Sequence, residues 1–196
     1  MEELVISKIA IVTGCFGFIG NHLMLKLLKD GWYVFGIDKH TYVSNFDQTN
    51  YISENFPSNI DGVRNLLEII QCTLSSYDKP LFVQISTDEV YGDIQEGSFD
   101  EEAELNPSNP YAATKASADL FLKSWARTHG LEYLILRPSN NYGLFQYHEK
   151  LIPLAVKRLK DGKKIKLHDK GKPIRTWTHV EDTVNAVSIL VEKADR

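Results

Sequence analysis

A short apolar strand that runs into a glycine-rich turn constrains the fold of this chain more than any other feature. Residues 8–13 (KIAIVT) form a continuous apolar run, which is typical of a strand buried on both faces of a parallel sheet. The turn over residues 13–20 (TGCFGFIG) follows at once, and apolar residues recur at helical spacing over 18–29. Residues 32–37 (WYVFGI) predict a second strand. The sequence therefore opens with a strand, a glycine turn, a helix and a strand.

The glycine turn has the spacing of a phosphate-binding loop. Gly14, Gly17 and Gly20 recur at three-residue intervals where a strand becomes a helix, so backbone amides can face a pyrophosphate that the missing side chains let approach. Asp38 ends the second strand, where its carboxylate can accept hydrogen bonds from an adenosine ribose and repel a 2′-phosphate, which favours NAD over NADP. The neighbouring Lys39 weakens that preference. The alternative is a set of ordinary turn glycines beside a surface aspartate.

The rest of the chain continues to alternate strands with helices. Strands are expected at residues 81–86, 133–136 and 164–168, and helices at about 59–77, 110–129, 149–160 and 180–193. This alternation predicts an α/β fold, a Rossmann-like doubly wound parallel sheet of strand order 2-1-3-4 with right-handed crossovers. We expect an NAD-binding domain over residues 1–143, shortened near 40–58, and a partial substrate-binding region with a terminal helix over 144–196. That region would form a small, incomplete C-terminal substrate cap.

Composition excludes several classes of function. The 22 Lys and Arg against 26 Asp and Glu leave a net charge of −4, so we expect no general attraction to nucleic acid or to an anionic membrane. Apolar runs stay well below the roughly 18 residues of a membrane span. The two cysteines and scattered histidines show no metal-ligand spacing, so no metal is expected. A soluble cytoplasmic protein in a reducing compartment fits this composition.

Two further segments carry groups suited to proton transfer. Tyr111 and Lys115 are four residues apart on one predicted helix, so their side chains share a face. A nearby ammonium and an oxidised nicotinamide would stabilise the phenolate that hydride transfer requires. The strand at 81–86 runs into Thr87, Asp88 and Glu89, at the carboxyl edge where doubly wound folds bind ligands. An aromatic core residue beside a solvated lysine, and a solvated acidic loop, are the alternatives.

These motifs together resemble those of the extended short-chain dehydrogenase/reductases, and within them the nucleotide-sugar 4,6-dehydratases. The matching stretches are TGCFGFIG, STDEVYGD, NPYAATKASAD, RPSNNYG with QYHEKLIPL, and IRTWTHVED. The glycine turn and the Tyr-x-x-x-Lys spacing mark the superfamily, whereas the Asp-Glu pair is sharper because related epimerases and decarboxylases usually lack it.

The resemblance implies a site, a cofactor and a reaction. Tyr111, assisted by Thr87 and Lys115, would remove the 4-hydroxyl proton of the sugar as hydride leaves C4; Glu89 would take the C5 proton, and Asp88 would protonate the departing 6-hydroxyl. Hydride then returns to C6, so the reaction is a lyase step. The catalytic residues would be Thr87, Asp88, Glu89, Tyr111 and Lys115. The residues expected to bind NAD are Gly14, Gly17, Phe18, Ile19, Gly20, Asp38, Lys39, Tyr111 and Lys115.

The resemblance also implies the partners. Asn140, Lys150, Leu151 and Arg175 match family positions that contact a nucleoside diphosphate sugar, and surface charge is the alternative for Lys150 and Arg175. Lys166 and His168 depart from the dTDP-sugar pattern, so both dTDP-glucose and a UDP-sugar are candidate substrates. The family forms dimers through the helices corresponding to 59–77 and 110–129, where Leu120, Phe121 and Trp125 provide apolar surface. Burial inside one subunit would explain those three residues nearly as well.

The chain is shorter than the family pattern. Members of the family carry two more strands and their helices between positions corresponding to Asp38 and Asn59, and they continue past Arg196. The 20 residues between cannot supply these elements, because one crossover needs a dozen or more residues. Either the protein is shortened or the sequence joins segments that are separate in a longer parent. Joined segments would place consecutive Cα atoms between about Asn45 and Asn55 much further apart than ~3.8 Å.

The shortening leaves two rival functions open. An epimerase or decarboxylase on the same scaffold would share Tyr111 and Lys115 but would not use Asp88. A non-catalytic protein that binds NAD or a nucleotide sugar would use only the binding residues. The products formed from dTDP-glucose and UDP-glucose distinguish these possibilities.

Overall fold

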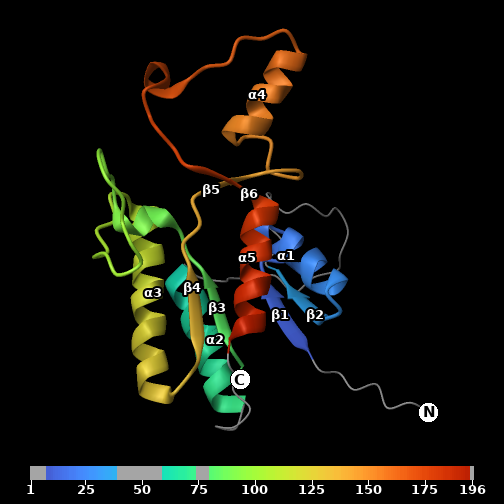
Figure 1. The fold of residues 1–196 in the computed structure, drawn as a ribbon, viewed down its shortest axis with the longest axis vertical. Helices are drawn as coiled ribbons and strands as arrows, with labels where there is room; N and C mark the ends of the chain where they lie inside the picture. The colour runs from blue at the N-terminus through green and yellow to red at the C-terminus, as the bar shows by residue number, and fades with distance from the viewer. Residues whose placement is uncertain (1–7, 39–58, 74–79, 195–196) are drawn as a thin grey trace, which may run out of the picture. The chain divides into compact units, whose positions relative to one another are not determined.

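The computed structural model describes residues 8–38, 59–73 and 80–194 of the chain (Figure 1). They divide into two compact units. The first takes its residues from Met1–Glu54 and Asn140–Arg196, and the second from Asn55–Ser139. The division expected from sequence, between a cofactor-binding domain ending at residue 143 and a substrate-binding region starting at 144, is a division by function and stays a prediction. Across the described residues, no helix has the length and apolar character needed to cross a membrane.

The first unit is built around a parallel pair of strands and two helices. Its elements are β1 (Ile9–Thr13), α1 (Phe18–Lys29), β2 (Tyr33–Ile37), β5 (Asn140–Tyr142), α4 (Leu151–Lys160), the short 3₁₀ helix η2 (His168–Gly171), β6 (Trp177–His179) and α5 (Val180–Lys193). Strands β1 and β2 pair in parallel from Ile9 opposite Tyr33 to Thr13 opposite Ile37. Helices α1 and α5 pack together, and each contributes buried aliphatic residues, such as Leu27 and Val184. This confirms the predicted strand, turn, helix and strand.

The β1–β2 pair is buried on one face only. Val12 is buried, whereas Ile11 and Phe35, which are paired across the two strands, are 65% and 62% exposed. Within the first unit, α1 therefore supplies a covering layer for one face of the pair. Burial of the other face would need a second layer, and it stays a prediction.

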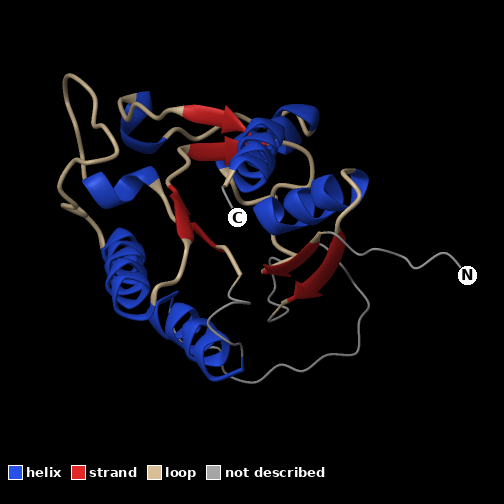
Figure 2. Cartoon of the chain, turned by 60° about the horizontal axis from the view of Figure 1, so that its bottom comes forward, coloured by secondary structure: helices blue, strands red, loops and turns tan. Residues whose placement is uncertain are grey.

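The second unit packs two helices beside a second parallel pair of strands. Its elements are α2 (Asn59–Thr73), β3 (Phe82–Ile85), the 3₁₀ helix η1 (Asp88–Tyr91), α3 (Pro110–His129) and β4 (Tyr133–Leu136). Strands β3 and β4 pair from Phe82 opposite Tyr133 to Ile85 opposite Leu136. Helices α2 and α3 bury a shared apolar cluster formed by Val63, Leu67, Ala118, Leu122, Ala126 and Leu131. The alternation of strands and helices can be followed in Figure 2.

Helix α3 has clear signals at both ends. The Asn109 side chain caps it by accepting a 2.9 Å hydrogen bond from the Ala112 amide, and Pro110 occupies its first turn, where no backbone donor is needed. Gly130 ends it in the left-handed conformation at φ 64°, which glycine adopts without steric cost. The prediction of a helix over 110–129 is confirmed.

Some predicted elements differ from the observed ones. Residues 164–167 form no strand, so the expected strand over 164–168 is wrong. Leu167 in this stretch is 57% exposed, and the nearby β6 pairs with β5 instead, from Asn140 opposite Trp177 to Tyr142 opposite His179. The observed pairs β1–β2 and β3–β4 agree with the predicted strand order 2-1-3-4. That order also makes β1 and β3 neighbours; these strands belong to different units, so their pairing stays a prediction. Residues 74–77 of the expected second helix lie outside the described residues.

Candidate active site

The glycine turn between β1 and α1 forms a tightly closed backbone loop. Gly14 takes a left-handed φ of 67°, its amide donates to the Ile37 carbonyl at 2.7 Å, and its carbonyl accepts from the Gly17 amide at 2.9 Å. A Cβ on Gly20 would lie 2.1 Å from the Gly14 carbonyl oxygen, so only glycine lets the first turn of α1 pack against the loop. Phe18 and Ile19 lie in that same first turn. The predicted turn residues are thus gathered at one helix N-terminus.

Asp38 belongs to the same turn. Its Oδ2 accepts a 2.8 Å hydrogen bond from the Phe16 amide, which ties the end of β2 to the glycine loop. A carboxylate accepts several hydrogen bonds, so a further donor can bind the same group. The predicted partner Lys39 lies outside the described residues, and so does the stretch from Asn45 to Asn55, where the Cα spacing would test for joined segments.

Thr87, Asp88 and Glu89 sit at the carboxyl end of β3. The backbone pairing of β3 with β4 continues past the ends of both strands, because the Asp88 amide donates to the Pro138 carbonyl at 3.2 Å. The buried Thr87 caps η1: its Oγ1 accepts from the Glu89 amide at 3.3 Å and lies 3.4 Å from Asp88 Oδ1. The hydroxyl of Thr87 therefore contacts both acidic residues that follow it.

The two adjacent carboxyl groups have different surroundings. Burial raises the pKa of Asp88, and the negative charge of Glu89 adds to the rise, while a hydrogen bond from Thr87 opposes it. Glu89 is exposed, and its Oε2 accepts a 2.9 Å hydrogen bond from the side-chain amide of Asn109. The raised pKa favours the protonated form of Asp88, as the role of a general acid requires.

Helix α3 carries the other two predicted catalytic residues. Tyr111 lies in its first turn and is 54% exposed; burial of the phenol and the charge of Glu89 raise its pKa. The Lys115 ammonium donates to the Ile85 carbonyl at the end of β3. Burial lowers the pKa of Lys115, and the charge of Asp119 partly offsets that effect. The protein alone therefore keeps the Tyr111 phenol protonated, and the expected phenolate needs a further positive charge.

A buried network beneath these residues was not predicted. Asp119 is fully buried, and its Oδ2 accepts from Ser86 Oγ at 2.8 Å and from Arg137 Nε at 3.1 Å. Arg137 also donates to the Tyr91 hydroxyl at 2.7 Å. The network joins β3, η1, α3 and β4. The sequence could have pointed to Asp119, because it lies four residues after Lys115 and therefore on the same face of the helix.

Asn109 is a further residue of the candidate site that the sequence analysis did not name. Its side-chain amide donates to Glu89, and its side-chain carbonyl caps α3. An asparagine directly before a proline at a helix start is a capping signal, so the cap could have been found from sequence. The contact with Glu89 spans 20 residues and could not.

The four predicted substrate residues lie in the first unit, at three places: β5, the start of α4 and the loop before β6. Asn140 is half-buried in β5, and its amide donates to the Thr176 carbonyl at 3.2 Å. Lys150 precedes α4 and Leu151 begins it; both are exposed. Arg175 is exposed in the loop before β6, with Nη1 3.1 Å from the Ile174 carbonyl. No direct contact between these four side chains was found among the described residues.

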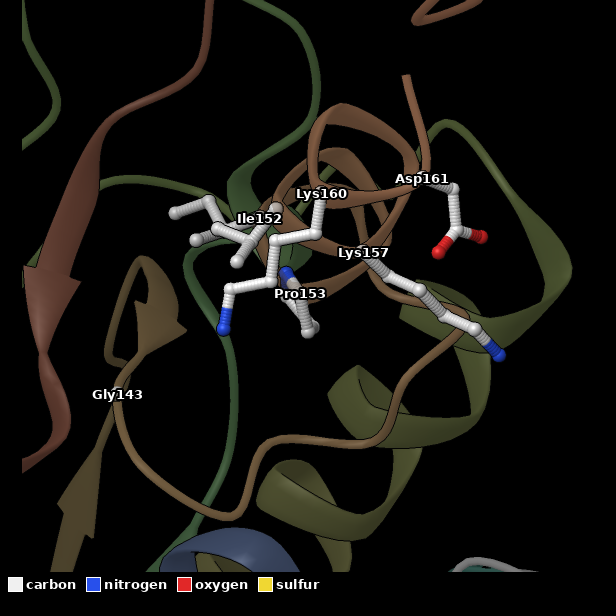
Figure 3. Close-up of a pocket in the computed structure, with 7 residues that line it drawn as sticks. Gly143, Ile152, Pro153, Lys157, Lys160 and Asp161 are labelled. Atoms are coloured by element: carbon white, nitrogen blue, oxygen red, sulfur yellow. The ribbon is translucent and has the colours of Figure 1, made fainter. Parts of the chain in front are cut away.

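An open cavity of about 450 Å³ lies against α4 (Figure 3). Gly143, Ile152, Pro153, Val156, Lys157, Lys160 and Asp161 line it, so it contains none of the four predicted substrate residues. The side chains of Lys157 and Lys160 point to different sides in Figure 3, which leaves no single cationic site. Within the described ranges, no three His, Cys, Asp or Glu residues gather as a metal site would require.

The fold and the two groups of residues define an α/β protein of the Rossmann class. A dinucleotide-dependent enzyme of this class has a glycine turn that opens a helix after a parallel strand. It also has acidic and phenolic side chains near the end of another parallel strand. The NAD dependent epimerase/dehydratase family matches residues 10–55 and 49–196, and the chain belongs to that family.

Similar proteins include several 4,6-dehydratases. The dTDP-glucose 4,6-dehydratase of Streptomyces niveus is 44% identical over 134 residues, which are 68% of this chain and 39% of that protein. The crystal structure of dTDP-glucose 4,6-dehydratase from Bacillus anthracis in complex with NAD has a TM-score of 0.85 and 32% identity, covering 96% of this chain and 73% of that one. DesIV, a dTDP-glucose 4,6-dehydratase from Streptomyces venezuelae with NAD and TYD bound, has a TM-score of 0.81 and 29% identity, covering 93% and 71%.

The match covers only part of the length of the curated relatives. It spans 39% of the Streptomyces niveus enzyme and 43% of a second relative, from Haloferax volcanii. The two stretches that match the family overlap at residues 49–55, inside the segment where the sequence analysis expects missing elements. Both explanations of the shortening, a shortened protein or joined segments, stay open.

Proposed function

We propose that this chain carries the catalytic centre of an NAD-dependent nucleotide-sugar 4,6-dehydratase, a hydro-lyase that converts dTDP-glucose or a UDP-sugar to its 4-keto-6-deoxy form. One observation carries the proposal: Asp88 and Glu89 are consecutive, yet Asp88 is partly buried with a raised pKa, whereas Glu89 is exposed and hydrogen-bonded to the N-terminus of the helix that bears Tyr111. Two carboxyl groups in unlike surroundings suit an acid and a base in one reaction. The names of the relatives support the same reaction.

The glycine turn and Asp38 fit the cofactor. The close packing of Gly20 against the Gly14 carbonyl, which a Cβ would prevent, sets the N-terminus of α1 directly against the glycine loop, and the backbone amides of that first turn suit a pyrophosphate. Asp38, held against the turn by Phe16, would accept from a ribose hydroxyl, and Lys39 would lie beside it. When bound, NAD supplies a hydride acceptor for C4, a hydride donor for C6 and a positive charge in the site.

Tyr111 is the proton acceptor for the sugar 4-hydroxyl in this scheme. Its raised pKa keeps the phenol protonated in the free protein, so it becomes a base only when positive charge is added nearby. The oxidised nicotinamide would supply that charge, Lys115, held at the Ile85 carbonyl, would assist from the same helix face, and the Thr87 hydroxyl would orient the same sugar oxygen. The base is therefore activated only in the loaded site.

Glu89 and Asp88 divide the elimination of water between them. Glu89 removes the C5 proton, which the C4 ketone acidifies, and the electron pair forms the C5–C6 double bond as the C6–O bond breaks. Asp88 gives its proton to the departing oxygen, so water leaves. Once hydride has been delivered to C6, the proton held by Glu89 returns to C5. Tyr111 then releases the proton it took from the 4-hydroxyl and Asp88 takes one up, by exchange with solvent, so protons and electrons balance and the substrate undergoes no net oxidation.

We further propose how the substrate binds and how the chain assembles. Asn140, Lys150, Leu151 and Arg175 would contact the nucleoside diphosphate, with the planar guanidinium of Arg175 on phosphate oxygens. The chain would act in the cytoplasm as a homodimer, with no nucleic acid or membrane partner. The mostly exposed Leu120 on α3 leaves apolar surface for a second copy, whereas Phe121 and Trp125 pack partly against the core of their own unit.

Product analysis tests the proposal. The purified chain is incubated with NAD and either dTDP-glucose or UDP-glucose, and mass and NMR spectra identify the product. Loss of water with a 4-keto-6-deoxy sugar is the expected result. A C4 epimer would instead indicate an epimerase, and bound NAD with unchanged sugar a non-catalytic binding protein.

A variant tests the role of Asp88. D88N cannot donate a proton as an acid does, so elimination should slow by about 10²–10⁴-fold while the first oxidation at C4 persists. Single-turnover measurements follow the two steps separately. Equal loss of both would contradict the assignment.

A further inference from the structure

Asn109 contacts two elements of the proposed site at once. Its Nδ2 donates to Glu89 Oε2 at 2.9 Å, and its Oδ1 accepts from the Ala112 amide at 2.9 Å. Glu89 lies in η1, after β3, whereas Ala112 lies in the first turn of α3 beside Tyr111. One amide side chain therefore joins the segment that carries Glu89 to the helix that carries Tyr111.

The Glu89 carboxylate needs such a contact to hold one position. Glu89 is exposed, and an unrestrained glutamate side chain samples several rotamers, so holding its carboxylate in one place opposes side-chain entropy. The Thr87 hydroxyl holds only the backbone amide of Glu89, which leaves the side-chain torsions unrestrained. Among the described residues, it is the side-chain amide of Asn109 that donates a hydrogen bond to the carboxylate itself.

Asparagine suits both contacts better than the other good capping residues. Ser, Thr and Asp also cap helices, because each offers an oxygen to the amides of the first turn. Only asparagine adds an N–H donor on a separate atom, which can point away from the helix while the carbonyl caps it. A hydroxyl is shorter and must use one atom for both contacts, and an aspartate would repel Glu89.

We propose that Asn109 is a positioning residue for removal of the C5 proton, which holds the Glu89 carboxylate in place relative to the helix that carries Tyr111. This inference rests on the proposed function and deepens it. Asn109 contacts neither the sugar nor NAD in this scheme; it acts through Glu89. Its removal should therefore slow one chemical step and leave the first oxidation nearly unchanged.

Two substitutions separate capping from positioning. N109S keeps a good cap but loses the donor to Glu89, so C5 proton removal should slow by about 10- to 100-fold, the scale of a small misplacement of a reacting group. N109D also keeps the cap and adds a negative charge beside Glu89, so the rate of C5 proton removal should fall further than in N109S. S108A, which changes the neighbouring exposed residue, is the matched control and should behave as the wild type.

The kinetic readout distinguishes positioning from a general structural defect. In N109S the deuterium isotope effect on kcat for substrate labelled at C5 should rise, because C5–H cleavage becomes more rate-limiting. The rate of C4 oxidation in a single turnover should change little. Parallel loss of both steps, or an unchanged isotope effect with a slower kcat, would overturn the positioning role.

A second readout needs neither substrate nor cofactor. The side-chain amide signals of Asn109 in ¹⁵N–¹H NMR spectra, assigned by their loss in N109S, should shift in E89A if the amide donates to that carboxylate. Unmoved signals would overturn the contact and with it the proposal. A wild-type chain without turnover would overturn the proposed function, and the role of Asn109 with it, while the amide signals still report whether the contact exists.

Discussion

At the scale of single residues, the surroundings of Asp88 link its proposed role to a cost in stability. Burial and the charge of Glu89 raise its pKa, so the folded chain binds this proton more tightly than the unfolded chain does. An unfolded aspartate loses its proton near pH 4, and stability attributable to Asp88 falls as the pH rises from there through the folded-state pKa. A protonated acid is useful in catalysis, and its ionised form is tolerated less well by the fold.

D88N should therefore be more stable than the wild type at neutral pH. The neutral amide removes the desolvation of an ionised carboxylate, and the difference should shrink as the pH falls through the folded-state pKa toward about 4, below which Asp88 is protonated in both states. Thermal unfolding at a series of pH values measures it. D93N, which changes an exposed carboxylate nearby, is the control and should leave Tm unchanged. A lower Tm for D88N at neutral pH would contradict the prediction.

Gly20 and Gly62 should respond in opposite ways to the same substitution. In G20A the new Cβ would lie 2.1 Å from the Gly14 carbonyl oxygen, so the loop must move, at a cost of about 1–3 kcal/mol. NAD binding, measured by calorimetry, should weaken by at least about tenfold. In G62A the Cβ meets nothing within 4 Å in α2, and stability should rise by about 0.5–1 kcal/mol. Unchanged NAD affinity in G20A would show that the loop does not hold the cofactor.

At the scale of elements, the buried pair of Asp119 and Arg137 joins α3 to β4. The side chains are 0% and 10% exposed and 3.1 Å apart. Breaking such a pair by removing one partner leaves an uncompensated buried charge. The two residues thus fix the helix that carries Tyr111 and Lys115 against the strand pair that positions Thr87.

R137M should lower the free energy of unfolding by about 3–5 kcal/mol, because Asp119 would then be buried without its cation. The double variant D119L/R137M should recover much of that loss, since replacing both partners with apolar residues is often neutral. Urea unfolding curves give both values. If the double variant were as unstable as R137M, the loss would come from packing rather than from the unpaired charge.

The elements predicted correctly from sequence are those with strong local signals. Helix α3 has a cap, a proline in its first turn and a C-terminal glycine, and α1 follows a glycine turn at once, so local chemistry fixes both. The strands β5 and β6 are three residues each, and only their pairing with each other distinguishes them from loop. The Lys-rich stretch at 164–167 alternates as a strand does yet has no strand partner among the described residues, which no local pattern can reveal.

The candidate site shows the same limit. Thr87, Asp88, Glu89, Tyr111 and Lys115 could be predicted because each belongs to a short motif in sequence, and their catalytic roles stay a prediction. Asp119 with Arg137 and Glu89 with Asn109 are joined over 18 and 20 residues, and their partners are set by the fold. Motifs therefore identify groups that can react, whereas the groups that hold them in place emerge only from the structure.

At the scale of the whole molecule, the proposed homodimer depends on the outer face of the α2–α3 pair. Leu120 is 56% exposed on α3, while Phe121 and Trp125 are partly buried against the apolar cluster of their own unit, with their rings 5.7 Å apart. Of the three apolar residues considered from sequence, Leu120 is thus the one left free for a partner. Its neighbours one turn away, Ser117 and Lys123, are polar and exposed.

L120D should convert a dimer to a monomer without unfolding the chain. A carboxylate at an exposed helical position costs the monomer little, but burying it in an interface without a cation costs several kcal/mol. Sedimentation velocity measures the state of the wild type and the variant. L190D places the same substitution on an exposed leucine of α5 and should leave the dimer intact. A monomeric wild type, or a dimer that persists in L120D, would remove this face from the proposed assembly, because an interface centred on Leu120 cannot accept a buried charge there.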